Sequence, residues 1–335
     1  MARGVDLSTY EKARLGRALL DLATSVVPYV GLTALMYALY DQVSVLVVLA
    51  LAIPTAGFLL RTFIVFHDCG HGSFFGDKRS NRWCGRLCAL LVWQPFSNWR
   101  HDHAVHHGSA GDLDRRGTGD VPTLTVDEYY AKGWRGRLGY RLFRSPLVMF
   151  GLGPVYSLMI APRLAPGGKR SRLRNSVLLT NLALGVSIAA LCLLLGWKEF
   201  MLVQLPAAYL AAAAGVWLFY VQHQFEDVYW ETGERWSYSD AALRGSSHLK
   251  LPQPLQFFSG NIGLHHVHHL SAKVPNYNLQ AAHDENPVFH QVPVLTLRDS
   301  LRCPRLKLID TPSGRLVTFG EARATMRAAP AALLG

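Results

Sequence analysis

The sequence predicts an all-α integral membrane protein in which four transmembrane helices and several interfacial helices support a cytoplasmic cap with a histidine-rich di-metal site. Three observations lead to this prediction. Half of the 335 residues are apolar and only 17% are charged, against roughly 25% in soluble proteins. The apolar residues gather in runs of membrane length, and most of the fourteen histidines fall into three short clusters. This composition excludes a disordered chain, a collagen, a coiled coil and a disulfide scaffold.

Four apolar stretches are long enough to cross the ~30 Å hydrocarbon core of a bilayer, which requires about 20 residues of helix. The first is longer than the apolar region of a signal peptide and lacks a clear cleavage site of small residues, so we expect an uncleaved anchor. Prolines inside these stretches are tolerated where neighbouring helices satisfy the freed carbonyl groups. The predicted spans cover residues 19–40, 43–62, 176–196 and 200–222.

Loop charges predict the orientation of these spans. Basic residues precede the first span and gather between the second and the third, whereas the other two connections hold only Lys198. Because positively charged loops remain in the cytoplasm, we expect both termini and the histidine clusters on that side. The net charge of +11 then follows from topology and indicates no nucleic-acid partner. The basic residues in question are Arg3, Lys12, Arg14, Arg17, Arg163, Lys169, Arg170, Arg172 and Arg174.

Residues 145–162 are also apolar, but a span here would place the following basic cluster outside and invert the last two spans. We therefore predict that 145–162 and the amphipathic stretch 84–96 lie in the membrane interface. Near residue 291 the pattern changes to mixed polarity, and the segments VPVLTLRDS and KLIDTPSGRLVTF predict short strands. The expected organisation is a membrane domain over residues 1–290 and a small cytoplasmic C-terminal tail over residues 291–335.

The three histidine clusters have the spacing of helix faces. Residues three or four apart lie on one side of a helix, so HDCGH presents two imidazoles, and HDHAVHH and HHVHH present three each. Imidazole suits iron, zinc, copper or nickel, and eight ligands exceed what one ion accepts, which indicates two metals. One more histidine directly follows the fourth span and emerges on the same side. The candidate ligands are His67, His71, His103, His106, His107, His265, His268 and His269, with His223 as the ninth.

The remaining histidines and the nearby acids receive other expected roles. His101 and His266 lie off the ligand faces, and His248, His283 and His290 are expected to be ordinary surface or packed residues. An acid beside a ligand can accept the second ring N–H and fix the tautomer, although a solvated carboxylate explains each acid equally well. The candidates for this support are Asp68, Asp102, Asp112 and Asp284, together with Glu226 one turn beyond His223.

Longer segments around these histidines resemble the membrane fatty acid desaturase family, and bacterial acyl-lipid desaturases in particular. The resemblance rests on HDCGHGSFFGDKRSN, AGDLDRRGTGDVPTLTVDEYY, FYVQHQFEDVYW and SSHLKLPQPLQFFSGNIGLHHVHHLSAKVPNYNL. It covers roughly residues 20–290. It implies two iron ions held by the nine histidines, with no catalytic residue beyond the ligands, in a cap on the cytoplasmic side of a bacterial cell membrane.

The resemblance also implies the reaction and its partners. An O2-dependent oxidation would remove two hydrogens from a lipid-linked acyl chain and leave a cis double bond. Two electrons would come from a separate ferredoxin- or flavodoxin-like protein, because the sequence has no haem-attachment, P-loop or dinucleotide-binding motif. The acyl-CoA branch of the family holds a metal-bound water with an asparagine one turn before the isolated histidine. Phe219 occupies that position here, and Asn261 is a candidate replacement.

Two alternatives remain open at the level of sequence. The same scaffold hosts hydroxylases, carotenoid oxygenases and sphingolipid desaturases, which the histidine clusters do not separate. A membrane metal transporter would also be rich in histidine, but transporters bind their cargo near the bilayer midplane. The middles of the four predicted spans contain no charged residue and no histidine, which argues against transport.

Overall fold

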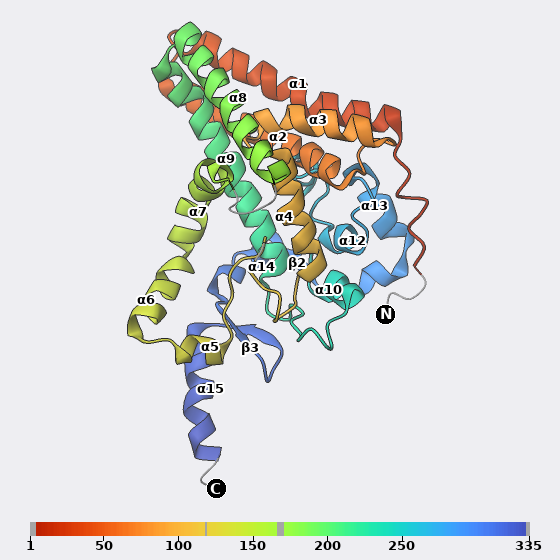
Figure 1. The fold of residues 1–335 in the computed structure, drawn as a ribbon, viewed down its shortest axis with the longest axis vertical. Helices are drawn as coiled ribbons and strands as arrows, with labels where there is room; N and C mark the ends of the chain where they lie inside the picture. Colours follow the sequence, from red (N-terminus) through yellow and green to blue (C-terminus); the bar gives the residue numbers. More distant parts are fainter. Residues whose placement is uncertain (1–4, 118, 166–170, 333–335) are drawn as a thin grey trace.

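Four helices are long and apolar enough to cross a membrane, at the positions that the sequence predicts. The computed structural model describes residues 5–117, 119–165 and 171–332, so the basic residues Arg3, Lys169 and Arg170 lie outside the described residues. The four long helices gather toward one end of the molecule (Figure 1). They are α1 (Leu15–Leu39), α2 (Val45–His71), α8 (Ser171–Leu195) and α9 (Trp197–His223).

Helix α2 is the centre of this bundle, because α1 and α9 both pack along it, while α8 packs on α9. Small buried residues such as Ala52 of α2 and Ala207 of α9 let the helices approach closely, as is common in membrane bundles. Leucines on the outer face of α8, including Leu193 and Leu194, are exposed. An apolar outer surface of this kind fits contact with lipid tails.

The second long helix continues beyond its predicted end at residue 62 and stops directly after His71. Gly72 ends it with a left-handed backbone, φ 78°, and its N–H donates to the carbonyl oxygen of Asp68 at 2.9 Å. Glycine takes this conformation without the steric cost that a side chain adds. The extra turns carry the first histidine cluster out of the predicted span and into the cap.

Two helices follow on the same side of the bundle. Helix α3 (Lys78–Leu91) is capped by Asp77, whose Oδ1 accepts from the N–H groups of Arg79 and Ser80 at 2.9 and 2.8 Å. Helix α4 (Phe96–Ser109) contains the second histidine cluster and packs against α2 and α8. The predicted interfacial stretch 84–96 thus comprises the end of α3 and the turn into α4, and its depth in the membrane stays a prediction.

Residues 145–162 are helical, but their helix is interrupted by turns of π-helix. The segment is bent by 53° against the preceding helix, and the pair counts as a fifth span only if the two pieces form one bent span. The predicted interfacial position therefore stays a prediction. The pieces are α6 (Trp134–Phe143), η1 (Leu147–Leu152), α7 (Gly153–Val155), η2 (Tyr156–Ile160) and η3 (Ala161–Arg163).

The cap is built around the third histidine cluster, which forms helix α12 (His265–Leu270) and packs against α10 and α13. Leu60 of α2, Tyr220 of α9 and Val267 of α12 belong to one buried apolar cluster. The ends of two long helices and the cap therefore share a core, which holds the histidine helices in a fixed relation. The other helices of the cap region are α5 (Val126–Ala131), α10 (Tyr238–Arg244), α11 (Gln253–Phe258), α13 (Asn276–Glu285) and η4 (Pro287–Gln291).

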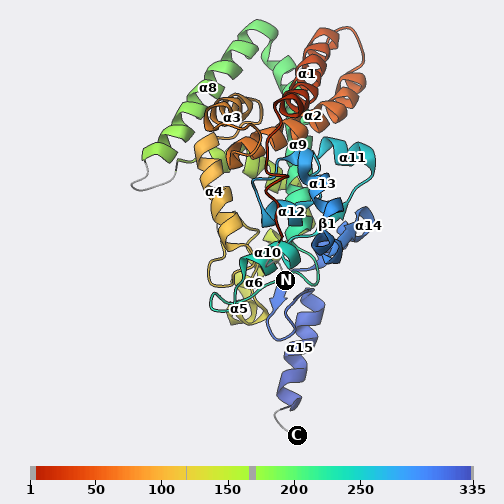
Figure 2. The ribbon, with the colours of Figure 1, turned by 90° about the vertical axis from the view of Figure 1, so that its right-hand side faces the viewer.

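The strands that the sequence predicts near the C-terminus are present. Strand β2 pairs in parallel with β1, with His248 opposite Val294, and β3 and β4 form an antiparallel hairpin with Leu308 opposite Val317. The sequence did not predict β1, which lies outside the two segments expected to form strands. Helix α15 projects away from the long helices (Figure 2). The elements are β1 (His248–Lys250), β2 (Val294–Thr296), α14 (Leu297–Ser300), η5 (Cys303–Arg305), β3 (Leu308–Asp310), β4 (Arg315–Val317) and α15 (Phe319–Ala332).

The segment after residue 291 is joined to the rest of the cap by more than β2. Leu316 is buried in the same apolar cluster as Val267 of α12, and Leu308 packs in a smaller cluster with Tyr129 of α5. The division of the chain into a membrane domain and a tail at residue 290 stays a prediction.

Candidate metal centre

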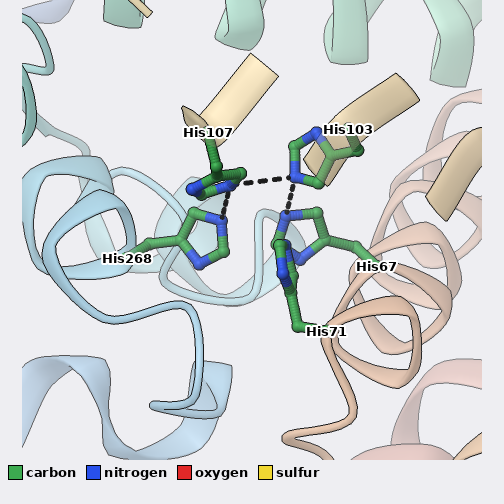
Figure 3. A group of neighbouring side chains, drawn as sticks. All are labelled: His67, His71, His103, His107 and His268. Atoms are coloured by element: carbon green, nitrogen blue, oxygen red, sulfur yellow. Dashed lines mark hydrogen bonds between the residues drawn. The ribbon is translucent and has the colours of Figure 1, made fainter. Parts of the chain in front are cut away.

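Three helices bring five of the predicted ligands into one cluster, which we call the five-histidine group (Figure 3). The candidate ligand nitrogens of this group all lie within 4.8 Å of one another. The Nε2 atom of His103 is 3.0 Å from that of His67 and 3.2 Å from that of His107, whose own Nε2 is 3.0 Å from that of His268. The members are His67 and His71 of α2, His103 and His107 of α4, and His268 of α12.

The other four predicted ligands form a second cluster, the four-histidine group, in which every residue is buried. The Nε2 atom of His223 lies 3.2 Å from that of His106 and 2.9 Å from that of His265. The structure thus gathers all nine predicted ligands into two groups, as two metals would require. The members of the second group are His106 of α4, His223 of α9, and His265 and His269 of α12.

The hydrogen bonds of the four-histidine group show which ring nitrogens are free. His106 Nδ1 lies 2.6 Å from a carboxylate oxygen of Asp120, and His223 Nδ1 lies 3.0 Å from the carbonyl oxygen of Gly245. Because both partners accept, each Nδ1 carries the proton and each Nε2 presents a lone pair. The two Nε2 atoms that carry these lone pairs are 3.2 Å apart. They repel one another unless a cation lies between them, so the arrangement fits a metal ion.

One ring of the five-histidine group has the same support. His67 Nδ1 donates to Asp68 at 2.9 Å, which turns the Nε2 lone pair toward His103. Asp68 is itself held by Asn276, whose backbone N–H and side-chain amide donate to Oδ2 at 2.6 and 3.0 Å. A fixed carboxylate of this kind orients the ring and increases its basicity toward a metal.

The spacing of the nitrogens also matches metal coordination. A metal–imidazole bond is 2.0–2.1 Å long for zinc, so two ligands at right angles lie about 3.0 Å apart. The Nε2 pairs in the two groups are separated by 2.9–3.2 Å. The Nε2 atoms of His71 and His269 are buried and have no hydrogen-bond partner within the described residues. The nine histidines therefore fit two metal ions.

Burial favours the neutral form of five of the imidazoles in α4 and α12, which is the form that binds metal. It lowers the pKa of His103 and His107 in α4 well below the usual value, and the neighbouring histidines lower each pKa further. The same two causes, in the same order, lower the pKa of His265, His268 and His269 in α12. A neutral ring leaves one nitrogen free to bind metal at physiological pH.

Aromatic side chains form the walls of the two groups. Trp99 stacks on His103 with ring centres 4.5 Å apart, and Phe219 lies 5.1 Å from His106 and 5.3 Å from His223. A Cβ atom on Gly70 would lie only 2.8 Å from the Trp99 ring, so glycine at this place lets the indole reach its position. These rings exclude water from the histidines and make their surroundings apolar.

Of the six polar side chains suggested as supports, only Asp68 hydrogen-bonds a predicted ligand in the described part of the chain. The others have partners elsewhere. The expectation for Glu226 needs correction, because its exposed side chain pairs with Arg315 rather than with His223. Asp102 accepts from Asn98, Asp112 from Arg115, Asp284 from Gln280, and Asn261 bonds to Gln256 and the Asn276 carbonyl.

Sequence reasoning missed two supports, Asp120 and the Gly245 carbonyl. Asp120 lies in a loop fourteen positions after His106, so no helical spacing relates the two residues. A backbone carbonyl such as that of Gly245 carries no sequence signal at all. Both were found only through the fold.

The remaining histidines lie outside the two groups, as expected. His266 is turned away from the ligands, and its Nε2 lies 3.0 Å from Nδ1 of His283. The rings of His248 and His283 meet edge to face with their centres 4.7 Å apart, and His290 Nε2 donates to the His283 carbonyl at 3.1 Å. His101 is not a member of either group.

Membrane-length helices, two of which end in ligands of largely buried histidine groups, define a membrane protein with a site able to bind metal. The chain belongs to the fatty acid desaturase family, whose model "Fatty acid desaturase" matches residues 43–295. Members of this family are oxidoreductases that act on acyl chains. The resemblance noted in the sequence is thereby confirmed.

Comparison with individual proteins agrees with this assignment. The chain is 46% identical over 313 residues to a "Fatty acid desaturase" of Bacillus subtilis, covering 93% of this chain and 89% of that protein. More distant relatives include two proteins of Synechocystis. One, the "sn-1 acyl-lipid omega-3 desaturase (ferredoxin)", is 30% identical over 66% of this chain and 62% of its own length. The other, the "sn-1 oleoyl-lipid 12-desaturase", is 28% identical over 67% and 64%.

Proposed function

We propose that this protein is a di-iron acyl-lipid desaturase that introduces a cis double bond into a lipid-linked acyl chain. The nine histidines would hold one iron ion in the five-histidine group and one in the four-histidine group. The observation that carries the proposal is the gathering of nine histidines in two separate groups, with neighbouring Nε2 atoms 2.9–3.2 Å apart and those of His106 and His223 both unprotonated.

Iron is the metal that best suits both the ligands and the reaction. Imidazole binds iron, zinc, copper and nickel, so the ligands alone leave four choices. Removal of hydrogen from a saturated chain is an oxidation, and zinc has no redox chemistry. When bound, the iron pair supplies the oxidising power, derived from dioxygen, that an unactivated C–H bond requires.

The chain's own residues contribute position and environment. Asp68, Asp120 and the Gly245 carbonyl hold three Nδ1 protons, so that the Nε2 atoms of those rings point inward. Trp99 and Phe219 keep the histidines in an apolar setting. Such a setting favours an acyl chain over water beside the site. Fixed placement of a methylene beside the site would select which carbons react.

A lipid-linked substrate is supported by the position of the site and by the names of two relatives. The histidines lie at the ends of membrane-length helices, where a chain anchored in a lipid can reach them. The two Synechocystis relatives are named for acyl-lipid and oleoyl-lipid substrates. All of the relatives named above are called desaturases, which favours desaturation over hydroxylation or carotenoid oxidation.

The electrons would come from a separate ferredoxin- or flavodoxin-like protein. The name of one Synechocystis relative includes the word ferredoxin. Two arginines of α6, the exposed Arg135 and the half-buried Arg137, have no ion pair among the described residues and offer a positive surface. Such a surface attracts an acidic carrier through long-range electrostatics.

The loop charges support a cytoplasmic location for both termini and the site. This orientation is tested by single cysteines at Glu234 and Arg323, which are exposed in the cap, and at Asp41, which is exposed in the turn between α1 and α2. An impermeant thiol reagent applied to intact cells should label the Asp41→Cys variant more than the parent protein and leave the other two at the parent level. Labelling of Glu234→Cys or Arg323→Cys from outside would contradict the four-span orientation.

The proposed reaction is tested by expression in a host that lacks polyunsaturated lipids, followed by mass spectrometry of double-bond positions in intact lipids. We expect new cis double bonds in phospholipid-bound chains, and their loss in the His71→Ala variant. Purified protein that turns over free acyl-CoA but not phospholipid in bilayers would refute the lipid-linked substrate. Hydroxylated products would refute desaturation itself.

A further inference from the structure

Arg144, at the end of α6, is a fully buried guanidinium with only 1% of its surface exposed. Within the described residues it forms no ion pair with a carboxylate. A buried charge without a counter-charge is costly, so it persists only where hydrogen bonds replace the lost water. The hydrogen bonds of the two terminal nitrogens, Nη1 and Nη2, therefore offset the cost of burial, whereas Nε has no partner among the described residues.

These bonds join three segments that are far apart in the chain. Nη1 donates to Thr123 Oγ1 at 3.1 Å, and Nη2 donates to Gln224 Oε1 at 2.8 Å. Nη2 also donates to the hydroxyl of Tyr220 at 3.2 Å and to the carbonyl of Leu306 at 3.1 Å. A single planar group thus connects the loop before α5, the end of α9 and the segment before β3.

Two of the three segments are connected to the four-histidine group, one through a ligand and one through the carboxylate that supports a ligand. Gln224 directly follows the ligand His223, and Thr123 lies three positions after Asp120, which hydrogen-bonds His106. Thr123 Oγ1 also lies 3.3 Å from Gln224 Oε1, so the loop and the helix end meet at the guanidinium. A shift of the loop relative to the helix end would therefore move Asp120 away from His106 or turn His223 away from its neighbours.

The five-histidine group is attached to a different buried arginine. Arg61 of α2 forms a buried ion pair with Asp21 of α1, and Asn276 donates to Asp21 at 3.0 Å. Asn276 also donates to Asp68, the partner of His67. Each histidine group therefore has its own arginine, and within the described residues the two arginines have no hydrogen-bond partner in common.

We propose that Arg144 is a positioning residue for the four-histidine group alone. It holds the Asp120 loop and the end of α9 in register, so that the Nε2 atoms of His106 and His223 face one metal position. This inference rests on the proposed function, because it requires that both groups bind metal.

The test compares metal content in the purified full-length holoprotein. Arg144→Met should reduce iron from about two to about one per chain, because the Asp120 loop and the end of α9 would lose the group that holds them in register. Arg61→Met is the matched variant and should lose the ion of the five-histidine group instead. Arg144→Lys, which keeps the charge but not the planar set of donors, should also lose the ion of the four-histidine group. Thr123→Val should reduce the iron content less.

Double variants identify the affected group and separate this role from general destabilisation. Arg144→Met combined with His223→Ala should lose no more iron than His223→Ala alone, because both changes act on one site. The double variant that combines Arg144→Met with His71→Ala should lose nearly all of its iron. Thr123→Val removes one acceptor of Arg144 and leaves the guanidinium with its other partners, and it keeps the test decisive if Arg144→Met does not fold.

Two results would overturn the proposal. The first is full iron content in Arg144→Met and Thr123→Val, and the second is equal loss from both groups. Failure of the proposed function has a different signature, because the unsubstituted protein would then bind fewer than two irons. In that case titration of the variants with zinc as a probe of the same sites still shows whether Arg144 acts on one group.

Discussion

The two histidine groups share helices α4 and α12 but differ in the third helix that completes them. Helix α2 contributes two ligands to the five-histidine group, whereas α9 contributes only His223 to the four-histidine group. The supports differ in the same way. Asp68 lies inside helix α2 next to its histidine, but Asp120 comes from a loop. The first group is thus built mainly from regular helix, and the second depends on one isolated ligand and a connecting segment.

This difference predicts unequal properties for two ions of the same kind. An ion that accepts six ligands would keep one position free in the five-histidine group and two in the four-histidine group. The four-histidine group therefore has more room for exogenous ligands. It also has less redundancy, because removal of His223 takes away the only ligand from α9.

The largest effect is expected for His223→Ala. Loss of this ligand should empty the four-histidine group, so that iron falls to about one per chain and unsaturated product nearly disappears. His290→Ala is the control, because His290 lies outside both groups and bonds only to the His283 carbonyl among the described residues. The check is elemental analysis with lipid mass spectrometry. Full iron and normal turnover in His223→Ala would show that another group fills its place.

A smaller effect is expected when the carboxylate supports are neutralised one at a time. Asp120→Asn should weaken metal binding in the four-histidine group, and Asp68→Asn in the five-histidine group, each by roughly 10–100-fold. Competition with a calibrated chelator measures both affinities. The exposed Asp284→Asn should match the parent protein. If Asp120→Asn has no effect, the hydrogen bond to His106 does not set its tautomer.

A change in packing should affect the five-histidine group more weakly. In Gly70→Ala the new methyl group meets the Trp99 ring at 2.8 Å, which displaces the indole from His103. We expect a loss of about 1–3 kcal/mol in stability, as for other overpacked sites, and little change at the four-histidine group. Thermal unfolding measures it against Gly139→Ala, where a Cβ meets no atom within 4 Å. Equal melting temperatures would refute the contact.

The smallest effect concerns the histidines that belong to neither group. Burial, with the charge of His283, lowers the pKa of His248 to about 4, whereas an unfolded chain protonates it near pH 6.5. Its contribution to stability is complete above about pH 6.5 and is lost as the pH falls toward 4, because the unfolded state then binds the extra proton.

His248→Gln should therefore make unfolding less sensitive to acid between pH 6.5 and 4 and leave iron content unchanged. Unfolding of the metal-bound protein is followed by circular dichroism across this range. Loss of iron in His248→Gln would place this residue in the metal centre after all.

The sequence predicted the histidines of the two groups better than their surroundings for a physical reason. Residues three and four apart share a helix face in any helix, so the ligand faces of His67 with His71 and of His103 with His107 follow from spacing alone. The spans followed from length and hydropathy in the same way. His223 was found because it ends a predicted span, which fixes its depth.

Contacts that depend on the tertiary path of the chain could not be read in this way. Asp120 reaches His106 through a loop, and Arg144 reaches Gln224 across eighty positions. Glu226 was expected beside His223 because of helical spacing, but α9 ends at His223, so the residues beyond it no longer follow the helix. Spacing rules stop being valid where the helix stops.

The central claim is that two separate histidine groups each hold one iron ion, and anomalous X-ray scattering at the iron edge tests it most directly. The account predicts two peaks per chain, one among the five-histidine group and one among the four-histidine group, each about 2.0–2.3 Å from ring nitrogens. A single peak between the groups, or the anomalous signal of zinc in place of iron, would contradict it.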